Sequence, residues 1–81
     1  MELKETVSMM LSNDYKERFR AEYNQLVIRY RKLEDMLAKW DTGQLDFEPS
    51  CNRGLYNFQI RAMADYIAVL ESRAQIEGIS L

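Results

Sequence analysis

The sequence has no histidine, one cysteine, one proline and three glycines. Without histidine the common zinc-ligand sets are missing, and Cys51 has no second cysteine for an internal disulfide. No glycine-rich phosphate loop and no serine/histidine or cysteine/histidine set is available for catalysis. The scarcity of glycine and proline argues against a sheet-rich fold with many turns. We therefore expect an all-α protein that is not an enzyme and that holds neither a metal nor a cofactor.

The length of 81 residues predicts a single domain, residues 1–81, with a small hydrophobic core. A chain of this size buries only about 60–65% of the surface that its unfolded form exposes. Small domains usually compensate with disulfides, metals or association. Because the first two have no ligands or partners here, we expect the chain to associate.

Long apolar stretches are also missing. No apolar run approaches the roughly 18–20 residues that span a bilayer. The first six residues, Met-Glu-Leu-Lys-Glu-Thr, are too charged for a signal peptide. A single unpaired thiol suits a reducing compartment. These features predict a protein of the cytoplasm that has no membrane partner.

The charge is uneven along the chain. Residues 16–32 carry six cations against two acids, a local charge of +4, so the net charge of −2 leaves −6 on the remaining residues. A basic segment on an otherwise acidic protein favours a compact anionic ligand. A long nucleic acid would need a broader basic face and is not expected.

Apolar spacing predicts three helices. Leu3, Val7 and Met10 have the spacing of a short amphipathic helix within residues 1–11. Asp14 followed by Glu17 indicates a capping box, so a second helix is expected over 14–40. Its apolar positions alternate in steps of four and three, as in a coiled-coil seam, at Phe19, Tyr23, Leu26, Tyr30, Leu33, Leu37 and Trp40.

Residues 41–53 form the expected loop, which contains Gly43 and Pro49. Gly43 can end the second helix, and the proline prevents its early resumption. A third helix is expected over 53–77, where Gly78 stops it. The two long helices should form an antiparallel hairpin.

The third helix carries two apolar stripes. A single antiparallel partner covers one stripe, and the short first helix has too few apolar residues to cover the whole of the other. The second stripe therefore predicts assembly into a compact homo-oligomer. One stripe contains Tyr56, Ile60, Met63, Ile67, Leu70 and Ala74, and the other contains Leu55, Ala62, Tyr66, Val69 and Ile76.

Two groups of tyrosines and arginines are candidates for ligand binding. Arg29, Tyr30 and Arg31 combine guanidinium groups, which bind phosphate bidentately, with a ring that can stack on a base. The alternative is that Tyr30 belongs to the core and that both arginines are solvated. Tyr66 and Arg73 share one helical face, and the hairpin would bring Arg73 beside the start of the second helix. There Arg73 could instead pair with Glu17 or Glu22.

Two longer patterns resemble a known family. They are Asp14-Tyr15-Lys16-Glu17-Arg18-Phe19-x-x-Glu22 and Gln59-x-x-x-Met63-x-x-Tyr66-x-x-x-Leu70-x-x-Arg73. Together they resemble the helical hairpin of the bacteriophage cyclic-oligonucleotide sponges that counter CBASS immunity, which is also shared by anti-Thoeris sponges and by small gut-phage proteins. The resemblance covers about residues 12–76.

The resemblance implies a homo-oligomer, typically a hexamer, with ligand pockets between subunits. Such proteins bind cyclic di- or trinucleotide signals in the host cell cytoplasm without cleaving them. By position, Arg29 would meet phosphate, while Asn13 and Tyr15 would supply stacking and hydrogen bonds at the helix junction. Arg31 and Arg73 would belong to a second site for trinucleotides. With Tyr66, these residues make up the candidate ligand-binding set.

Two other functions stay open at this point. A structural or adaptor hairpin within a larger phage complex would form the same oligomer without depending on Arg29 or Tyr15. Weak nucleic-acid binding by residues 16–32 would depend steeply on salt, and the acidic remainder of the chain argues against it.

Overall fold

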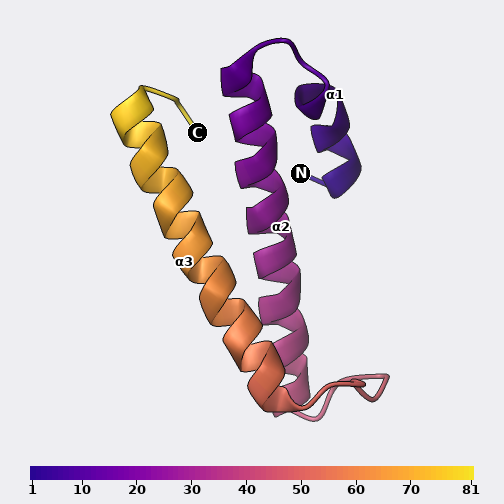
Figure 1. Ribbon diagram of the computed structural model, residues 1–81. Helices are drawn as coiled ribbons and strands as arrows, with labels where there is room; N and C mark the ends of the chain where they lie inside the picture. The colour runs from indigo at the N-terminus through magenta and orange to yellow at the C-terminus, as the bar shows by residue number, and fades with distance from the viewer.

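The computed structural model describes residues 1–81 and contains helices and loops but no β-strand (Figure 1). A 3-10 turn, η1 (Leu3–Thr6), leads into a short helix, α1 (Val7–Met10). Two long helices follow, α2 (Tyr15–Asp41) and α3 (Arg53–Glu77). The prediction of an all-α protein is confirmed. None of the helices is long and apolar enough to cross a membrane.

The first ten residues do not form the single short helix that the apolar spacing predicts. The Thr6 hydroxyl donates a hydrogen bond to the Leu3 carbonyl oxygen at 2.7 Å. Bonding of this kind competes with the α-helical pattern in a segment that is too short to propagate a helix. The result is a 3-10 turn followed by one α-helical turn.

The start of α2 is fixed by Asp14, in part as predicted. Its carboxylate accepts a hydrogen bond from the Lys16 backbone N–H at 3.0 Å, which satisfies one of the free donors of the first turn. The reciprocal half of the capping box is absent, because the Asp14 N–H donates to the Ser12 hydroxyl instead of to Glu17. Ser12 and Asp14 thus share the capping of this helix.

Each long helix is followed by a glycine with a left-handed backbone, two residues after the end of α2 and directly after the end of α3. Gly43 has a φ of 72° and Gly78 a φ of 71°, a conformation that costs glycine little and other residues more. Beyond Gly78, the Ile79 N–H donates to the Ala74 carbonyl oxygen at 2.8 Å. This bond turns the chain back, and the Ile79 side chain enters the core.

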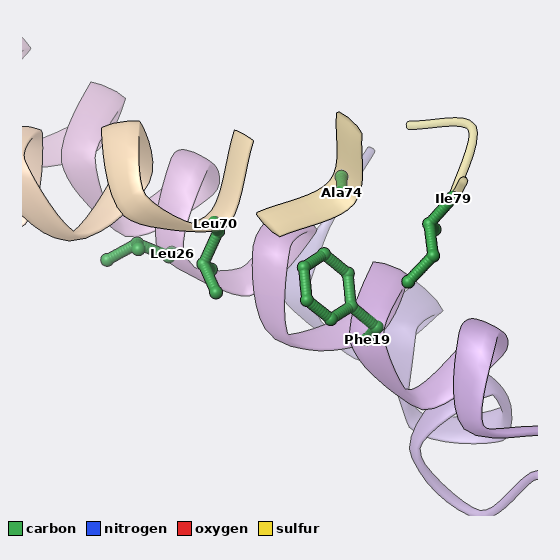
Figure 2. Packing of buried hydrophobic residues seen from close by; sticks show 5 residues of the cluster. All are labelled: Phe19, Leu26, Leu70, Ala74 and Ile79. Atoms are coloured by element: carbon green, nitrogen blue, oxygen red, sulfur yellow. The ribbon is translucent and has the colours of Figure 1, made fainter. Parts of the chain in front are cut away.

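The hydrophobic core lies where α2 begins and α3 ends. Figure 2 shows Phe19 and Leu26 from α2 facing Leu70 and Ala74 from α3, with Ile79 closing the end. Only eight of the 81 residues are buried, so the core of one chain is small. The first apolar stripe of α3 therefore packs on α2.

The short N-terminal segment packs on α2 and makes no contact with α3. The Gln25 amide donates a hydrogen bond to the buried Thr6 hydroxyl at 2.8 Å. Figure 1 accordingly shows α2 lying between α1 and α3. The second stripe of α3 could be covered by the first helix or by another subunit. Because the first helix packs on α2 alone, it does not cover the stripe. Leu55, Val69 and Ile76 stay 55%, 53% and 85% exposed.

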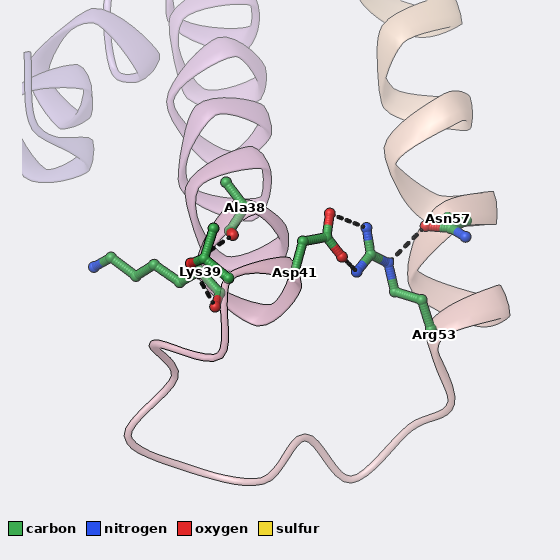
Figure 3. Close-up of polar contacts among 6 residues, drawn as sticks. Ala38, Lys39, Asp41, Arg53 and Asn57 are labelled. Atoms are coloured by element: carbon green, nitrogen blue, oxygen red, sulfur yellow. Dashed lines mark hydrogen bonds and ion pairs between the residues drawn. The ribbon is translucent and has the colours of Figure 1, made fainter.

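At the opposite end, one arginine ties the two long helices together across the loop. Arg53 donates to the Asp41 carboxylate at 2.5 Å and to the Asn57 side chain at 2.9 Å (Figure 3). Its guanidinium also lies 5.4 Å from the centre of the Trp40 ring. These contacts hold the end of α2 beside the start of α3.

Candidate functional site

A pocket of about 230 Å³ opens where α2 begins and α3 ends. It combines two cations, one carboxylate and two aromatic rings, so it can take a ligand that has both charged and flat apolar parts. Its volume is below the range of about 300–1,000 Å³ that is typical of small-molecule sites. We call it the Arg73 pocket, and it is lined by Tyr15, Arg18, Phe19, Glu22 and Arg73.

Tyr15, Arg73 and Glu77 form a closed ring of hydrogen bonds at the edge of this pocket. The Tyr15 hydroxyl donates to Glu77 Oε1 at 2.7 Å, and Arg73 Nε donates to Glu77 Oε2 at 3.2 Å. Arg73 Nη2 closes the ring by donating to the Tyr15 hydroxyl at 3.0 Å. Arg73 thus pairs with Glu77 rather than with Glu17 or Glu22.

The Phe19 ring contacts two of these side chains, Tyr15 and Arg73. The rings of Tyr15 and Phe19 stack with their centres 6.2 Å apart and their planes 12° apart. The Arg73 guanidinium lies 5.1 Å from the centre of the Phe19 ring, where it is attracted to the face of the ring. The sequence assigns Phe19 to the core through its heptad position, and the structure gives it this second role.

The hydrogen bonds set the protonation states around the pocket. Accepting the Tyr15 hydrogen bond, together with the nearby Arg73 cation, holds the pKa of Glu77 below its ordinary value. The same contact with Glu77 raises the pKa of Tyr15, and desolvation adds to the effect. At neutral pH the ring therefore contains an ionised carboxylate and a neutral phenol.

Tyr66 reaches the pocket through Glu22. Its hydroxyl donates to Glu22 Oε2, and this contact raises the pKa of Tyr66. Tyr66 comes from α3 and Glu22 from α2, so the pair joins the two helices next to the pocket. Of the predicted set, Tyr15, Tyr66 and Arg73 are thus brought together.

Asn13 lies in the turn before α2 and is exposed. Arg18, a lining residue that the sequence analysis does not single out, donates to the Ser12 carbonyl oxygen at 2.8 Å and ties this turn to the pocket. Asn13 therefore borders the site without lining it.

Arg29 and Arg31 lie outside the pocket. Arg29 is exposed and makes no hydrogen bond or ion pair. It lies on the same face of α2 as Glu22, about 10 Å further along the helix axis. Arg31 is two residues on, about 200° around the helix. Arg31 therefore lies on the side of α2 away from Glu22. Its positive charge there partly offsets the rise in the pKa of Tyr23.

Glu77 is the main residue of the site that the sequence does not predict. The only available signal is its spacing of four residues from Arg73, which permits an ion pair on one helix face. Spacing cannot show that the same carboxylate also accepts from Tyr15, 62 residues away.

A second cavity, of about 290 Å³, lies between α2 and the loop after it and contains none of the predicted site residues. Its two lysines, Lys32 and Lys39, are offset by Asp35 and Asp46, so its charge favours no class of ligand. No group of three or more cysteine, aspartate or glutamate side chains is arranged to hold a metal ion.

Comparison with known proteins identifies the family. The model of the Sequestin family matches residues 13–76, a range that contains every lining residue of the Arg73 pocket. No curated protein and no solved structure matches the chain. The family name points to the binding of a small signalling molecule rather than to catalysis. The resemblance to the phage sponges is confirmed, and the chain belongs to the Sequestin family.

Proposed function

We propose that this protein binds and sequesters a cyclic di- or trinucleotide immune signal without cleaving it, and so lets a phage evade CBASS-type defence in the host cytoplasm. The observation that carries the proposal is the Arg73 pocket, within a chain of the Sequestin family. Its side chains match the two parts of such a ligand, the phosphates and the bases.

The phosphate would be received by Arg73. Its Nη1 donors have no partner within the chain, and an arginine can offer two parallel hydrogen bonds to a phosphate. Arg18 adds a second cation beside it. Arg18 and Arg73 are balanced by Glu22 and by Glu77, which bonds Arg73, so Arg73 would bind the phosphate through its unpaired hydrogen-bonding fork and not through a net positive charge.

The base would be received by Tyr15. This residue is 40% exposed, and its ring stacks on that of Phe19. Stacking of a base on an aromatic side chain is tolerant of base identity and contributes about 1–3 kcal/mol. Asn13, which borders the pocket, can add hydrogen bonds to the base edge.

Assembly would complete the site. Val69, on the uncovered stripe of α3, lies three residues from Tyr66 and four from Arg73, so the stripe adjoins the pocket. We propose that the single domain 1–81 forms an antiparallel hairpin and that copies pack on this stripe, as a hexamer by resemblance. The packing would enclose the small pocket and bring Arg29 of a neighbouring copy to the ligand.

The resemblance groups Arg31 with Arg73 in a second site. Within one chain Arg73 lies in the pocket with Tyr15, while Arg31 lies on the other flank of α2, so we assign only Arg31 to a separate site. By resemblance, copies of Arg31 would meet near a symmetry axis and receive a cyclic trinucleotide there. We therefore expect Arg31→Ala to weaken the binding of cyclic trinucleotides more than the binding of cyclic dinucleotides.

Isothermal titration calorimetry with a panel of cyclic di- and trinucleotides tests the proposal. We expect tight binding of at least one compound, weaker binding by Arg29→Ala and Tyr15→Ala, and no change in Arg61→Ala, an exposed arginine of α3 outside the pocket. No binding by any compound, with Arg29→Ala indistinguishable from the parent, would rule the function out.

The exposed stripe by itself also favours a second function, a structural or adaptor hairpin in a larger phage complex. That function requires the same self-association and predicts that the Arg29 and Tyr15 variants behave like the parent. Calorimetry on the same variants separates the two functions.

A further inference from the structure

Glu77 contacts both ligand-binding side chains of the Arg73 pocket without lining the pocket itself. One of its carboxylate oxygens accepts from Tyr15 and the other from Arg73. Both oxygens are therefore occupied by side chains that come from different helices. Glu77 also lies just outside residues 13–76, the range that the family model matches.

The hydrogen bonds leave one edge of the Arg73 guanidinium available. A guanidinium has five N–H donors in a fixed plane. Nε is used by Glu77 and one Nη2 donor by Tyr15, both on the same edge. The edge formed by Nη1 and the second Nη2 donor stays unpaired, and this fork matches two phosphate oxygens.

The same contacts fix the Tyr15 ring. Its hydroxyl donates to Glu77 and accepts from Arg73, while its ring lies on Phe19. Because the hydroxyl and the ring of Tyr15 are both held in place, the side chain loses little conformational freedom when a base stacks on it. This favours binding.

Glu77 is the last residue of α3, and the residues after it contact α2. Gly78 ends the helix in a left-handed conformation, and its carbonyl oxygen accepts from Lys16 Nζ at 3.4 Å. Arg20 donates to the Ser80 carbonyl oxygen at 2.6 Å, and Ile79 is buried. The segment that follows Glu77 is therefore anchored to α2.

From this geometry we propose that Glu77 is a positioning residue, which orients the Arg73 fork toward phosphate and holds the Tyr15 ring for stacking. This inference rests on the proposed function. The opposite possibility is that the carboxylate competes with the ligand for Arg73. The geometry argues against competition, because Glu77 takes Nε and leaves the terminal fork free.

The chain provides a matched control. Glu71 accepts a hydrogen bond from the Tyr23 hydroxyl at 2.7 Å, the same distance as between Tyr15 and Glu77. This pair also joins α2 to α3, but Glu71 and Tyr23 are not among the lining residues of the pocket. Glu71→Ala therefore removes an equivalent interhelical bond without touching the proposed site.

The test measures the affinity of four proteins, the parent, Glu77→Ala, Glu77→Gln and Glu71→Ala, for cyclic di-GMP, cyclic di-AMP and cyclic GMP–AMP. We expect Glu77→Ala to bind about tenfold more weakly, the loss of one charge-assisted contact. Glu77→Gln keeps an acceptor oxygen, so it should restore affinity to within about threefold. Glu71→Ala should bind like the parent. Its melting temperature should also fall, but by less than that of Glu77→Ala, because Glu77 additionally pairs with Arg73.

Parental or tighter binding by both Glu77 variants would overturn the positioning role, and tighter binding would identify Glu77 as a competitor. If Glu71→Ala weakens ligand binding as much as Glu77→Ala does, the positioning role is also overturned, because the loss of affinity would then come from general destabilisation of the fold. If the parent and Glu71→Ala bind none of the three compounds, the proposed function fails for them and the positioning role fails with it.

Discussion

At the scale of single residues, the site depends on a tyrosine and a carboxylate that fix each other's protonation states. The pKa of Tyr15 is raised chiefly by its hydrogen bond to Glu77, while Arg73 acts in the opposite direction. The phenol therefore stays a neutral donor over the whole physiological range. This is the state that the proposed stacking of a base on Tyr15 requires, because a phenolate would repel the anionic ligand that we propose.

Replacing Glu77 by alanine should lower the pKa of Tyr15. The substitution removes the main cause of the rise and leaves the lowering effect of Arg73 in place. An NMR titration of the tyrosine ring carbons measures this directly, and Tyr23 serves as the internal control because its own partner is Glu71. An unchanged Tyr15 pKa would mean that the contact with Glu77 does not persist in solution.

How far the site could be predicted also differs residue by residue. The approach of Arg73 to Tyr15 follows from the order and length of the two long helices. Arg29 and Arg31 have the right chemistry for phosphate, but their separation of about 200° on one helix keeps them from acting on one pocket within a chain. The role of Glu77 depends on a contact across 62 residues, which local spacing does not encode.

At the scale of helices, the ends are determined by local chemistry. Asp14 begins α2 at residue 15, and Gly78 ends α3 after residue 77, close to the ranges 14–40 and 53–77 that the sequence predicts. The first helix is different, because the Thr6 hydroxyl takes a backbone acceptor and shortens it. Capping residues are readable from the sequence, whereas such a competing bond depends on the tertiary position of Thr6 against Gln25.

The contact between Asp41 and Arg53 makes the end of the helix pair sensitive to acid. The hydrogen bond from Arg53 holds the pKa of Asp41 below its ordinary value. The stability that this pair contributes is therefore fully present above pH of about 4, the unfolded value, and is lost as pH falls through the lower folded value. The contribution is small, because Asp41 is exposed to solvent and Arg53 is only partly buried.

Asp41→Asn should accordingly lose less stability on acidification than the parent does. Melting temperatures measured from pH 7 downward compare the two proteins, with Glu71→Ala as a second control for a lost interhelical contact. Glu77 also has a lowered pKa, so some acid sensitivity should remain in Asp41→Asn. Parallel pH profiles for the parent and Asp41→Asn would show that the Arg53 contact does not stabilise the folded chain.

At the scale of the whole molecule, the small core and the uncovered stripe of α3 are two aspects of one property. Residues that would complete a core in a larger domain are exposed here, and the first helix packs elsewhere. The sequence predicts the surplus apolar surface from two stripes on one helix. It cannot decide what covers the second stripe, because that depends on where the first helix packs.

Val69→Lys should disrupt self-association, because it places a charge in the middle of the exposed stripe. Gln75→Lys is the matched control, with the same new charge on the same helix but about 120° away around it. Size-exclusion chromatography with light scattering measures both. If the Val69→Lys assembly has the same mass in solution as that of the parent, the stripe is not the interface. The same conclusion follows if both variants form equally smaller assemblies.

Native mass spectrometry after incubation with cyclic di- and trinucleotides tests the sequestering role most directly, because one spectrum reports the subunit number, the bound ligand and whether that ligand is intact. We expect a homo-oligomer that carries uncleaved cyclic nucleotide, and Val69→Lys should lose the subunits and the ligand together. A monomer, or an oligomer that retains none of the compounds, would contradict the proposal that assembly creates the binding site.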